Sequence, residues 1–491
     1  MYLNTIFGSH LNMQKKFLSN LILLVFLNLL VKPFWIFVEI NVQNATGTKQ
    51  YGMYFALLNL SLIINFLLDL GITNYNNRNI AQNHQLLQKH LSGIILLRFL
   101  LAAVYFIVVV AIGLVIGYSK YQLLVLMLLG FNQFLIAFTQ YLRSNISGLH
   151  LFKTDSFLSV TDRLLMIVFV CALLWGNFTS EPFKIEWFIY AQTAAYLITA
   201  LIAFAVVLQK SGKLELNWNP SFFKAILKQS FPYALLIFLM FIYTRSDAIL
   251  LERMLKKGEL ESGIYAQAFR LLDVVNMFGF LFAGLLLPIF SKMLKQQHSV
   301  KQLTALSFRL MMAPAITIVI ICLFFNFDIM NLLYEEQTEV SAKLLPVLMA
   351  AIIPICSGFV LGTLLTAHGK LDELNRIAMM AVGINIILNL QLIPDYKAQG
   401  AATSALITQL FNAVFQVYAV KKIFGWTVSR SLIFSLVSFA ALAYLSAWFL
   451  SDLENRLLGI GVTTGVCIIL AFATRLISIK GIFAILKEKE N

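Results

Sequence analysis

Long hydrophobic runs recur along the whole chain and are separated by short polar segments. Each run is about as long as the roughly 20 mostly apolar residues that a membrane-spanning helix needs. The runs are continuous, whereas a transmembrane strand would alternate apolar and polar residues. We expect about fourteen transmembrane helices, over 17–40, 52–73, 91–117, 121–142, 156–176, 187–208, 229–251, 264–290, 305–327, 341–366, 375–393, 399–420, 432–450 and 457–474.

The composition supports this interpretation. Of the 491 residues, 60% belong to the AVILMFWYC set and only 12% are charged, whereas soluble domains have about 45–50% apolar and about 25% charged residues. So few charges could not cover a soluble surface of this size. The chain is therefore predicted to be an all-α polytopic membrane protein. Its four cysteines fall inside hydrophobic runs and are not spaced as metal ligands.

Lysine and arginine are unequally distributed between alternate loops. Of the 37 basic residues, 22 lie on the side of the N-terminus and eight on the other side. Cytoplasmic loops carry an excess of lysine and arginine, so both termini are predicted to lie in the cytoplasm. The net charge of +14 thus reflects topology. Because the basic residues are scattered, no nucleic-acid partner is expected.

A short motif recurs about 211 residues along the chain, as GMYFA at 52–56 and GIYAQ at 263–267. A true repeat at this spacing predicts two six-helix lobes, and transporters commonly bind their substrate between such halves. The alternative is that the motif recurs by chance in an aromatic-rich chain. The predicted organisation is an N-lobe over 1–210, a C-lobe over 211–425, and two further helices with a cytoplasmic tail over 426–491.

Several charged side chains lie inside the predicted spans. A charge in the bilayer is costly, so it normally faces a cavity or a partner. Lys32 lies deep in the first span, and Arg245 and Arg270 lie in the seventh and eighth. The excess of these cations over unpaired anions favours an anionic ligand, because such groups donate charge-assisted hydrogen bonds to phosphate. These three residues are the candidate substrate-binding side chains.

Three carboxylates in the spans, Asp69, Asp247 and Asp273, are candidate coupling or pairing groups. Arg270 and Asp273 are three residues apart on one helix face and can neutralise each other. Arg245 and Asp247 are two apart, so they face different neighbours. We expect a basic residue or a loop beside each carboxylate, which weakens the case for a cation exporter.

Charges nearer the span ends are expected to extend along their helices to the head groups. They are Arg98, Asp162, Arg163, Arg309 and Lys343. No motif for metal-dependent hydrolysis, phosphate binding or nucleophilic catalysis is present. The acidic cluster Glu335, Glu336 and Glu339 is interpreted as a solvated loop. We therefore do not expect an enzyme. The alternative is a membrane glycosyltransferase or polymerase, which would require an acidic catalytic or metal-binding site that faces water.

Six short segments, in order along almost the whole chain, match a known sequence pattern. They are 51–54 (YGMY), 69–72 (DLGI), 243–251 (YTRSDAILL), 263–272 (GIYAQAFRLL), 287–292 (LPIFSK) and 393–402 (IPDYKAQGAA). Together they resemble the polysaccharide (Wzx-type) flippases of the multidrug/oligosaccharidyl-lipid/polysaccharide exporter superfamily. The resemblance implies two six-helix lobes, as in multidrug (MATE) transporters and lipid II flippases, followed here by two C-terminal helices.

The resemblance also implies a function. It predicts export across a bacterial inner membrane, by alternating access, of undecaprenyl-pyrophosphate-linked oligosaccharide units for O-antigen (lipopolysaccharide), capsule or exopolysaccharide synthesis. A cationic cavity would hold the pyrophosphate, and Lys32 and Arg270 lie on comparable helices. No cofactor is expected, and the substrate gradient, the membrane potential or exchange of H⁺ or Na⁺ would drive transport. The expected partners are the lipid-linked oligosaccharide, membrane lipids, and the polymerase and glycosyltransferases of the pathway. The alternative in this superfamily is a cation-coupled multidrug exporter that depends on Asp69 or Asp247.

Overall fold

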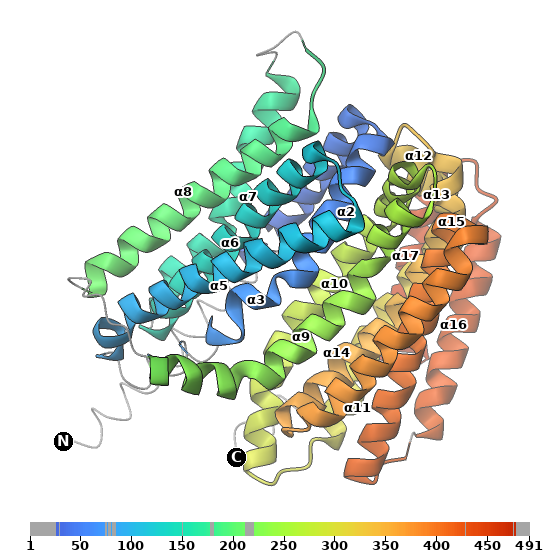
Figure 1. The fold of residues 1–491 in the computed structure, drawn as a ribbon. Coiled ribbons are helices and arrows are strands. Elements are labelled where there is room, and N and C mark those ends of the chain that lie inside the picture. Colours follow the sequence, from blue (N-terminus) through green and yellow to red (C-terminus); the bar gives the residue numbers. More distant parts are fainter. Residues whose placement is uncertain are drawn as a thin grey trace. The chain divides into compact units, whose positions relative to one another are not determined.

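The chain is helical wherever the structure, a computed structural model, describes regular structure. Twelve helices in the described part are long and apolar enough to cross a membrane. The chain divides into two compact units, 1–241 and 242–491 (Figure 1). The structure describes residues 26–477 apart from 29, 74–75, 77–79, 81–84, 150, 177–180, 212–219, 428 and 475.

The first unit consists of long helices packed side by side (Figure 1). α6 lies against α2, α5, α7 and α8, and is thus central to the unit. Residues 30–46 are helical and precede α2. The elements are α2 (Thr48–Ile64), α3 (Phe66–Asp69), α5 (Leu86–Ile116), α6 (Lys120–Gly148), α7 (Phe152–Trp175), α8 (Ile185–Ser211) and the first part of α9 (Pro220–Met254).

A tight turn joins α5 to α6 and holds them side by side. Gly117 ends α5 with a φ of 83°, a left-handed conformation that glycine adopts without strain. Ser119 then begins α6 with a capping box. Its hydroxyl accepts a hydrogen bond from the Gln122 amide nitrogen at 3.2 Å, and its own amide donates to Gln122 Oε1 at 3.0 Å. The first helical N–H groups are thereby satisfied within the turn.

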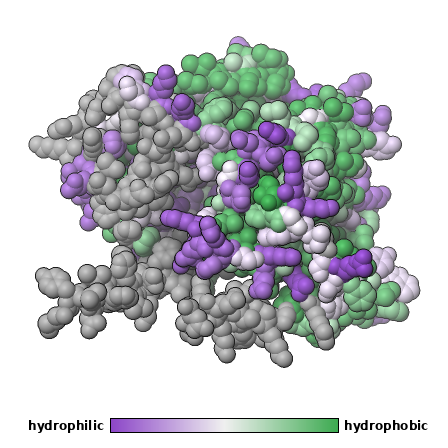
Figure 2. Space-filling view, turned by 90° about the horizontal axis from the view of Figure 1, so that it is seen from below, coloured by the Kyte–Doolittle hydropathy of each residue, from purple (hydrophilic) through white to green (hydrophobic). Residues whose placement is uncertain are grey.

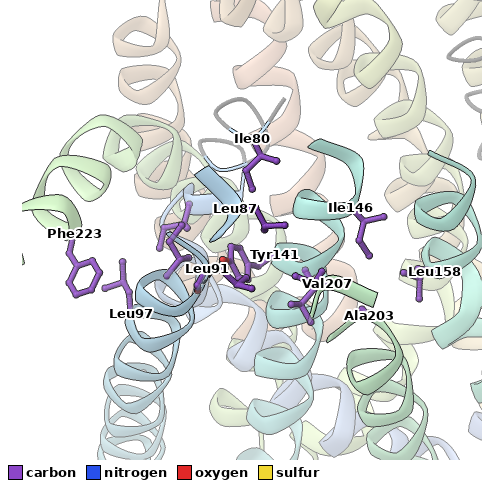
Figure 3. Close-up of a cluster of buried hydrophobic side chains, with 13 residues drawn as sticks. Ile80, Leu87, Leu91, Leu97, Tyr141, Ile146, Leu158, Ala203, Val207 and Phe223 are labelled. Carbon is purple, nitrogen blue, oxygen red and sulfur yellow. Dashed lines mark hydrogen bonds between the residues drawn. The ribbon is translucent and has the colours of Figure 1, made fainter. Parts of the chain in front are cut away.

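A hydrophobic core at one end of the first unit joins α5, α6, α7, α8 and the start of α9 (Figure 3). Tyr141 is fully buried within it. The core also includes Ile72 and Ile80, which follow α3, and so ties the end of that helix to α5 and α6. Its remaining members are Leu87, Leu91, Ile94, Leu97, Leu142, Ile146, Leu158, Ala203, Val207 and Phe223.

The described residues of the second unit contain the rest of α9 and eight further helices. α14 packs against α10, α11 and α15, and the last two helices lie side by side and pack on α11 (Figure 1). The predicted all-α membrane fold is confirmed. The helices are α10 (Gly258–Lys295), α11 (Lys301–Phe324), α12 (Asn326–Leu333), α13 (Thr338–Ala350), α14 (Ile352–Ala367), α15 (Leu371–Phe424), α16 (Arg430–Leu450) and α17 (Arg456–Ala473).

α15 contains two predicted spans, 375–393 and 399–420, joined across a sharp break. Lys397 at the break has φ 50° and ψ −131°, which no helix accommodates. The backbone then passes so close to itself that a Cβ on Gly400 would lie 2.4 Å from the carbonyl oxygen of Leu392. Glycine is therefore required here, and the element forms two arms on either side of Lys397.

Other boundaries differ from the predicted ones. The single predicted span 341–366 consists of α13 and α14, which are separated at Ala351, and the short α12 was not expected. The beginning of the span 17–40 and the tail 478–491 lie outside the described residues. The total of about fourteen spans, the cytoplasmic termini and the lobe boundary at 210/211 stay predictions.

Candidate functional site

Lys32 is half-buried in the first unit and lies near the charges of Asp162 and Arg163. Arg163 stacks on the ring of Trp35, with its guanidinium carbon 5.4 Å from the ring centroid. Its Nη1 donates to the Tyr196 hydroxyl at 3.3 Å. The expectation that Arg163 extends to the head groups is therefore wrong, because an aromatic face and a hydroxyl hold its guanidinium inside the unit.

Buried hydrogen-bonded pairs lie close to this group. The Tyr51 hydroxyl donates to Glu39 at 3.3 Å, and Gln192 Nε2 donates to the Tyr54 hydroxyl at 3.0 Å. Glu39 is 4% exposed and also acts on the charge of Arg163. Asp162 acts on both Lys32 and Arg163, and Arg143, the other cation near Lys32, forms an ion pair with Asp155 at 2.8 Å. The surroundings of Lys32 do not form a purely cationic site.

Arg98, predicted to reach the head groups, is instead 1% exposed, so that expectation is also wrong. Its Nη1 donates to the Leu68 carbonyl at 2.9 Å, its Nη2 donates to the Thr73 hydroxyl at 2.7 Å, and it forms an ion pair with Asp69. The guanidinium also lies 5.0 Å from the ring centroid of Tyr141. The end of α3 supplies these acceptors, so Arg98 and Asp69 fix the local backbone.

Arg245 and Arg270 in the second unit share one carboxylate, that of Asp273. Arg245 donates to both of its oxygens, at 3.0 and 3.3 Å, and Arg270 Nη1 lies 3.9 Å from it. Arg245 also lies over the ring of Phe269, 4.9 Å from its centroid. The side chains of Arg245, Arg270 and Asp273 are 20%, 11% and 22% exposed. These three side chains, the arginine cluster below, carry a net charge of +1 and are partly accessible.

Asp247 has different surroundings, although it lies only two residues from Arg245 on α9. It is 1% exposed. Tyr265 donates its hydroxyl to Oδ2 at 2.8 Å, while Asn389 and Asn385 donate to Oδ1 at 2.6 and 3.2 Å. This polar centre is formed by α9, α10 and α15 and is closed to solvent.

The three predicted carboxylates therefore differ in how their charge is balanced. Asp69 is paired with Arg98 and Asp273 with Arg245. In the described part of the chain, every hydrogen-bond donor that contacts Asp247 is neutral. The expectation of a basic residue or loop beside it is thus wrong. A buried carboxylate without a cation is costly, and such groups in membrane spans are typical of ion or proton sites.

Sequence reasoning missed the partners of Asp247. Asn385 and Asn389 are four residues apart and so share a helix face. The Ser404 hydroxyl donates to the Asn385 carbonyl at 3.2 Å, and this hydrogen bond connects the two arms of α15. Tyr265 lies in the repeated motif, and its counterpart Tyr54 also buries a hydrogen-bonded hydroxyl in its own unit. Nothing local in the sequence connects these residues to Asp247. Among the described residues, no group of three or more His, Cys, Asp or Glu could hold a metal ion.

Comparisons with known proteins agree with this architecture. Residues 17–294, more than half of the chain, match the family model described as polysaccharide biosynthesis protein. A relative from Staphylococcus aureus, capsular polysaccharide biosynthesis protein CapF, is 26% identical over 236 residues, which cover 46% of this chain and 59% of CapF. The chain thus matches less than two thirds of the length of that relative.

Solved structures show the same fold at low sequence identity. The lipid II flippase MurJ in an inward closed conformation matches with a TM-score of 0.74 and 13% identity, over 92% of this chain and 99% of MurJ. An inward-facing multidrug resistance MATE transporter of the MOP superfamily matches with a TM-score of 0.61 and 13% identity, over 82% of this chain and 98% of the transporter. The predicted resemblance is confirmed, and the chain belongs to the polysaccharide biosynthesis protein family, with the fold of the MOP-superfamily transporters.

Proposed function

We propose that this protein is a flippase that moves an oligosaccharide linked to a polyprenyl pyrophosphate from the cytoplasmic to the outer leaflet of a bacterial inner membrane. The oligosaccharide would be a repeat unit of O-antigen, capsule or exopolysaccharide. The arginine cluster carries the proposal, since it places a net positive charge, partly accessible, among membrane-spanning helices. Family membership and the transporter fold support it. The polymerase and glycosyltransferases of the pathway are proposed partners.

The geometry of the arginine cluster suits a pyrophosphate. A guanidinium has five N–H donors in a rigid fork, and Asp273 accepts hydrogen bonds from only two nitrogens of Arg245. Asp273 and the Phe269 ring orient this fork, so phosphate oxygens can be bound with little further ordering. Charge-assisted hydrogen bonds are roughly twice as strong as neutral ones. In this proposal the sugars remain hydrated and the polyprenyl chain stays in the lipid.

Asp247 is the proposed coupling group. Because only neutral donors surround its carboxylate, binding of a proton or a sodium ion would remove an electrostatic penalty that no described cation offsets. Asp69 and Asp273 are less suited, since each already has an arginine partner. The driving force for transport would then be the gradient of that ion.

The proposal is tested by export of polysaccharide in a host that lacks its own flippase. We expect Arg245→Ala and Arg270→Ala to reduce surface polysaccharide strongly at unchanged expression. Lys343→Ala is the matched control, because Lys343 is an exposed cation on α13 and its loss should leave export intact. Full export by both arginine variants would show that the arginine cluster does not bind the substrate.

A cation-coupled multidrug exporter is the second candidate, and the buried Asp247 is the observation that favours it. In that case expression of the protein would protect a drug-sensitive host, and Asp247→Asn would abolish the protection. If the protein restores polysaccharide export and gives no drug resistance, this candidate is excluded.

A further inference from the structure

A cavity of about 300 Å³ opens where the two arms of α15 end in the second unit. The connections 368–370 and 425–427 adjoin it, so four of the predicted spans begin or end here. Figure 2 shows hydrophilic residues gathered on this end of the molecule, beside hydrophobic surface. The cavity, called the α15 cavity below, is lined by Lys370, Glu373, Arg376, Ile377, Met380, Phe415, Tyr418, Ala419, Lys422 and Ile423.

The rim of the α15 cavity is positively charged. Lys370, Arg376 and Lys422 are exposed, and the carboxylate in the lining, that of Glu373, lies 3.8 Å from Arg376. Arg376 is 73% exposed, so this i,i+3 pair is a weak surface interaction. The four side chains together carry a net charge of +2. These side chains can therefore bind an anionic group without breaking a strong ion pair among themselves.

The rest of the cavity is apolar and continues along α15. Met380, Phe415 and Tyr418 are 44%, 36% and 61% exposed. Farther along the two arms, apolar side chains stay exposed, as expected of a surface that faces lipid; they include Ile387, Leu390, Ile407, Leu410 and Val414. A ligand that fits both parts has an anionic head and a hydrophobic tail.

Aromatic side chains mark this end of α15 as the membrane–water boundary. Phe424 contacts Trp426, with ring centroids 4.8 Å apart, and His368, with centroids 5.0 Å apart. Tryptophan and tyrosine are enriched at the level of the lipid head groups, and Tyr418 lies in the same cavity. The charged rim is thus at the depth of a lipid phosphate, while the apolar part lies at the depth of acyl chains.

We propose that the α15 cavity binds an anionic glycerophospholipid, with its phosphate at Lys370, Arg376 and Lys422 and its acyl chains along the arms of α15. Anionic lipids gain about 1 kcal/mol for each basic residue near the membrane surface, which corresponds to about fivefold in affinity. The site is separate from the arginine cluster and does not depend on the proposed transport. A soluble phosphate is a poorer fit, because it would leave the exposed Met380, Phe415 and Tyr418 surface uncovered.

The test is native mass spectrometry of the detergent-solubilised full chain, titrated with phosphatidylglycerol or phosphatidylcholine of the same acyl composition. We expect preferential retention of phosphatidylglycerol, reduced at least about tenfold by the triple variant Lys370→Gln, Arg376→Gln, Lys422→Gln. The matched control is Lys120→Gln, Lys256→Gln, Lys257→Gln, which removes the same charge from exposed residues elsewhere. Equal loss in both variants would overturn the proposal, since it would reflect net charge alone.

Two further measurements distinguish a phospholipid from a soluble phosphate as the ligand. Phe415→Ala should weaken binding of a long-chain phosphatidylglycerol several-fold more than that of its dihexanoyl analogue. If Phe415→Ala weakens binding of both lipids equally, or if glycerol 3-phosphate competes as well as the lipid, the cavity binds only the phosphate group and not the acyl chains. Either result would overturn the proposal. It also fails if undecaprenyl phosphate is retained at these residues and phosphatidylglycerol is not. Size-exclusion profiles and melting temperatures unchanged from wild type establish that the surface variants fold.

Discussion

Substitutions at Arg270 can distinguish how its charge and its planar shape each contribute to pyrophosphate binding. Replacing Arg270 with Gln changes the net charge of the arginine cluster from +1 to 0 and leaves the two hydrogen bonds between Arg245 and Asp273 in place. Replacing it with Lys keeps the charge and removes the planar fork. The two variants have similar side-chain lengths, so they differ mainly in charge.

The expected magnitude follows from the exposure and distances of the arginine cluster. Arg270 is 11% exposed and 3.9 Å from Asp273. Two unit charges 4 Å apart interact by about 4 kcal/mol at an effective dielectric constant of 20, and this is an upper bound for partly accessible groups. A hydrogen bond to a charged group contributes about 1.5–3 kcal/mol. Arg270→Gln should therefore weaken pyrophosphate binding by about 10- to 150-fold, and Arg270→Lys by about tenfold or less.

The assay is isothermal titration of the purified protein with undecaprenyl pyrophosphate in detergent at two salt concentrations. Wild-type affinity should fall as salt rises, and the dependence should be weaker for Arg270→Gln. The melting temperature of each variant shows whether the fold is retained. Wild-type affinity in Arg270→Gln would refute the reasoning, and equal losses in the two variants would show that shape rather than charge determines binding.

Three further predictions concern other polar and packing features. Asp247→Asn should remove the stabilisation of the wild type by Na⁺ over K⁺, or weaken the dependence of its melting temperature on pH, measured by differential scanning fluorimetry; a response identical to that of the wild type would exclude Asp247 as the ion site. Arg98→Met leaves Asp69 without its cation; because Asp69 is 30% exposed and keeps two backbone donors, the loss should cost about 1–3 kcal/mol, seen as a lower melting temperature that Asp69→Asn partly restores. Gly279→Ala places a Cβ 2.1 Å from the Phe359 ring and should cost about 1–3 kcal/mol by overpacking; Phe359→Ala added to it should recover stability if this contact is the cause.

The hydrophobic pattern predicted the helices well because a bilayer leaves little choice. Lipid offers no hydrogen-bond partners, so the backbone of a spanning segment satisfies its own polar groups as a helix. The same pattern also placed the break near Lys397, since the predicted spans 375–393 and 399–420 lie on either side of it. The pattern did not place the separation of α13 from α14 at Ala351, which lies inside the continuous apolar run 341–366. The signal for it is Pro354 in the first turn of α14, which has no N–H to donate to the Ala350 carbonyl.

The candidate charges were found from the sequence, but their partners were only partly predictable. The relation between Arg270 and Asp273 follows from local helical spacing. The contact of Asp247 with Asn385 joins residues 138 positions apart, and no spacing rule reaches that far. Arg98 and Arg163 were predicted to reach the head groups because they lie near a span end. That prediction failed because distance along a helix does not show which helix face a residue occupies. Both side chains face the interior, where an aromatic ring and acceptors are available.

The arrangement of α9 against α10 links the proposed ion site to the proposed substrate site. Arg245 and Asp247 lie two residues apart on α9, and both are bound by α10, through Asp273 and Tyr265. Any shift of α9 along α10 must therefore change both contacts together. If occupancy of Asp247 biases that shift, pyrophosphate affinity will depend on the coupling ion, by about 5- to 150-fold for typical coupling energies.

This linkage can be measured directly, since it must be reciprocal at equilibrium. We expect titrations of the wild type to show different pyrophosphate affinities in Na⁺ and K⁺, or at two pH values, and Asp247→Asn to show only the part of this difference that comes from the ligand. The variant also corrects for titration of the pyrophosphate itself, which affects both proteins equally. If wild type and Asp247→Asn respond identically to the ion, Asp247 and Arg245 act independently, and the shared α9–α10 contact has only a structural role.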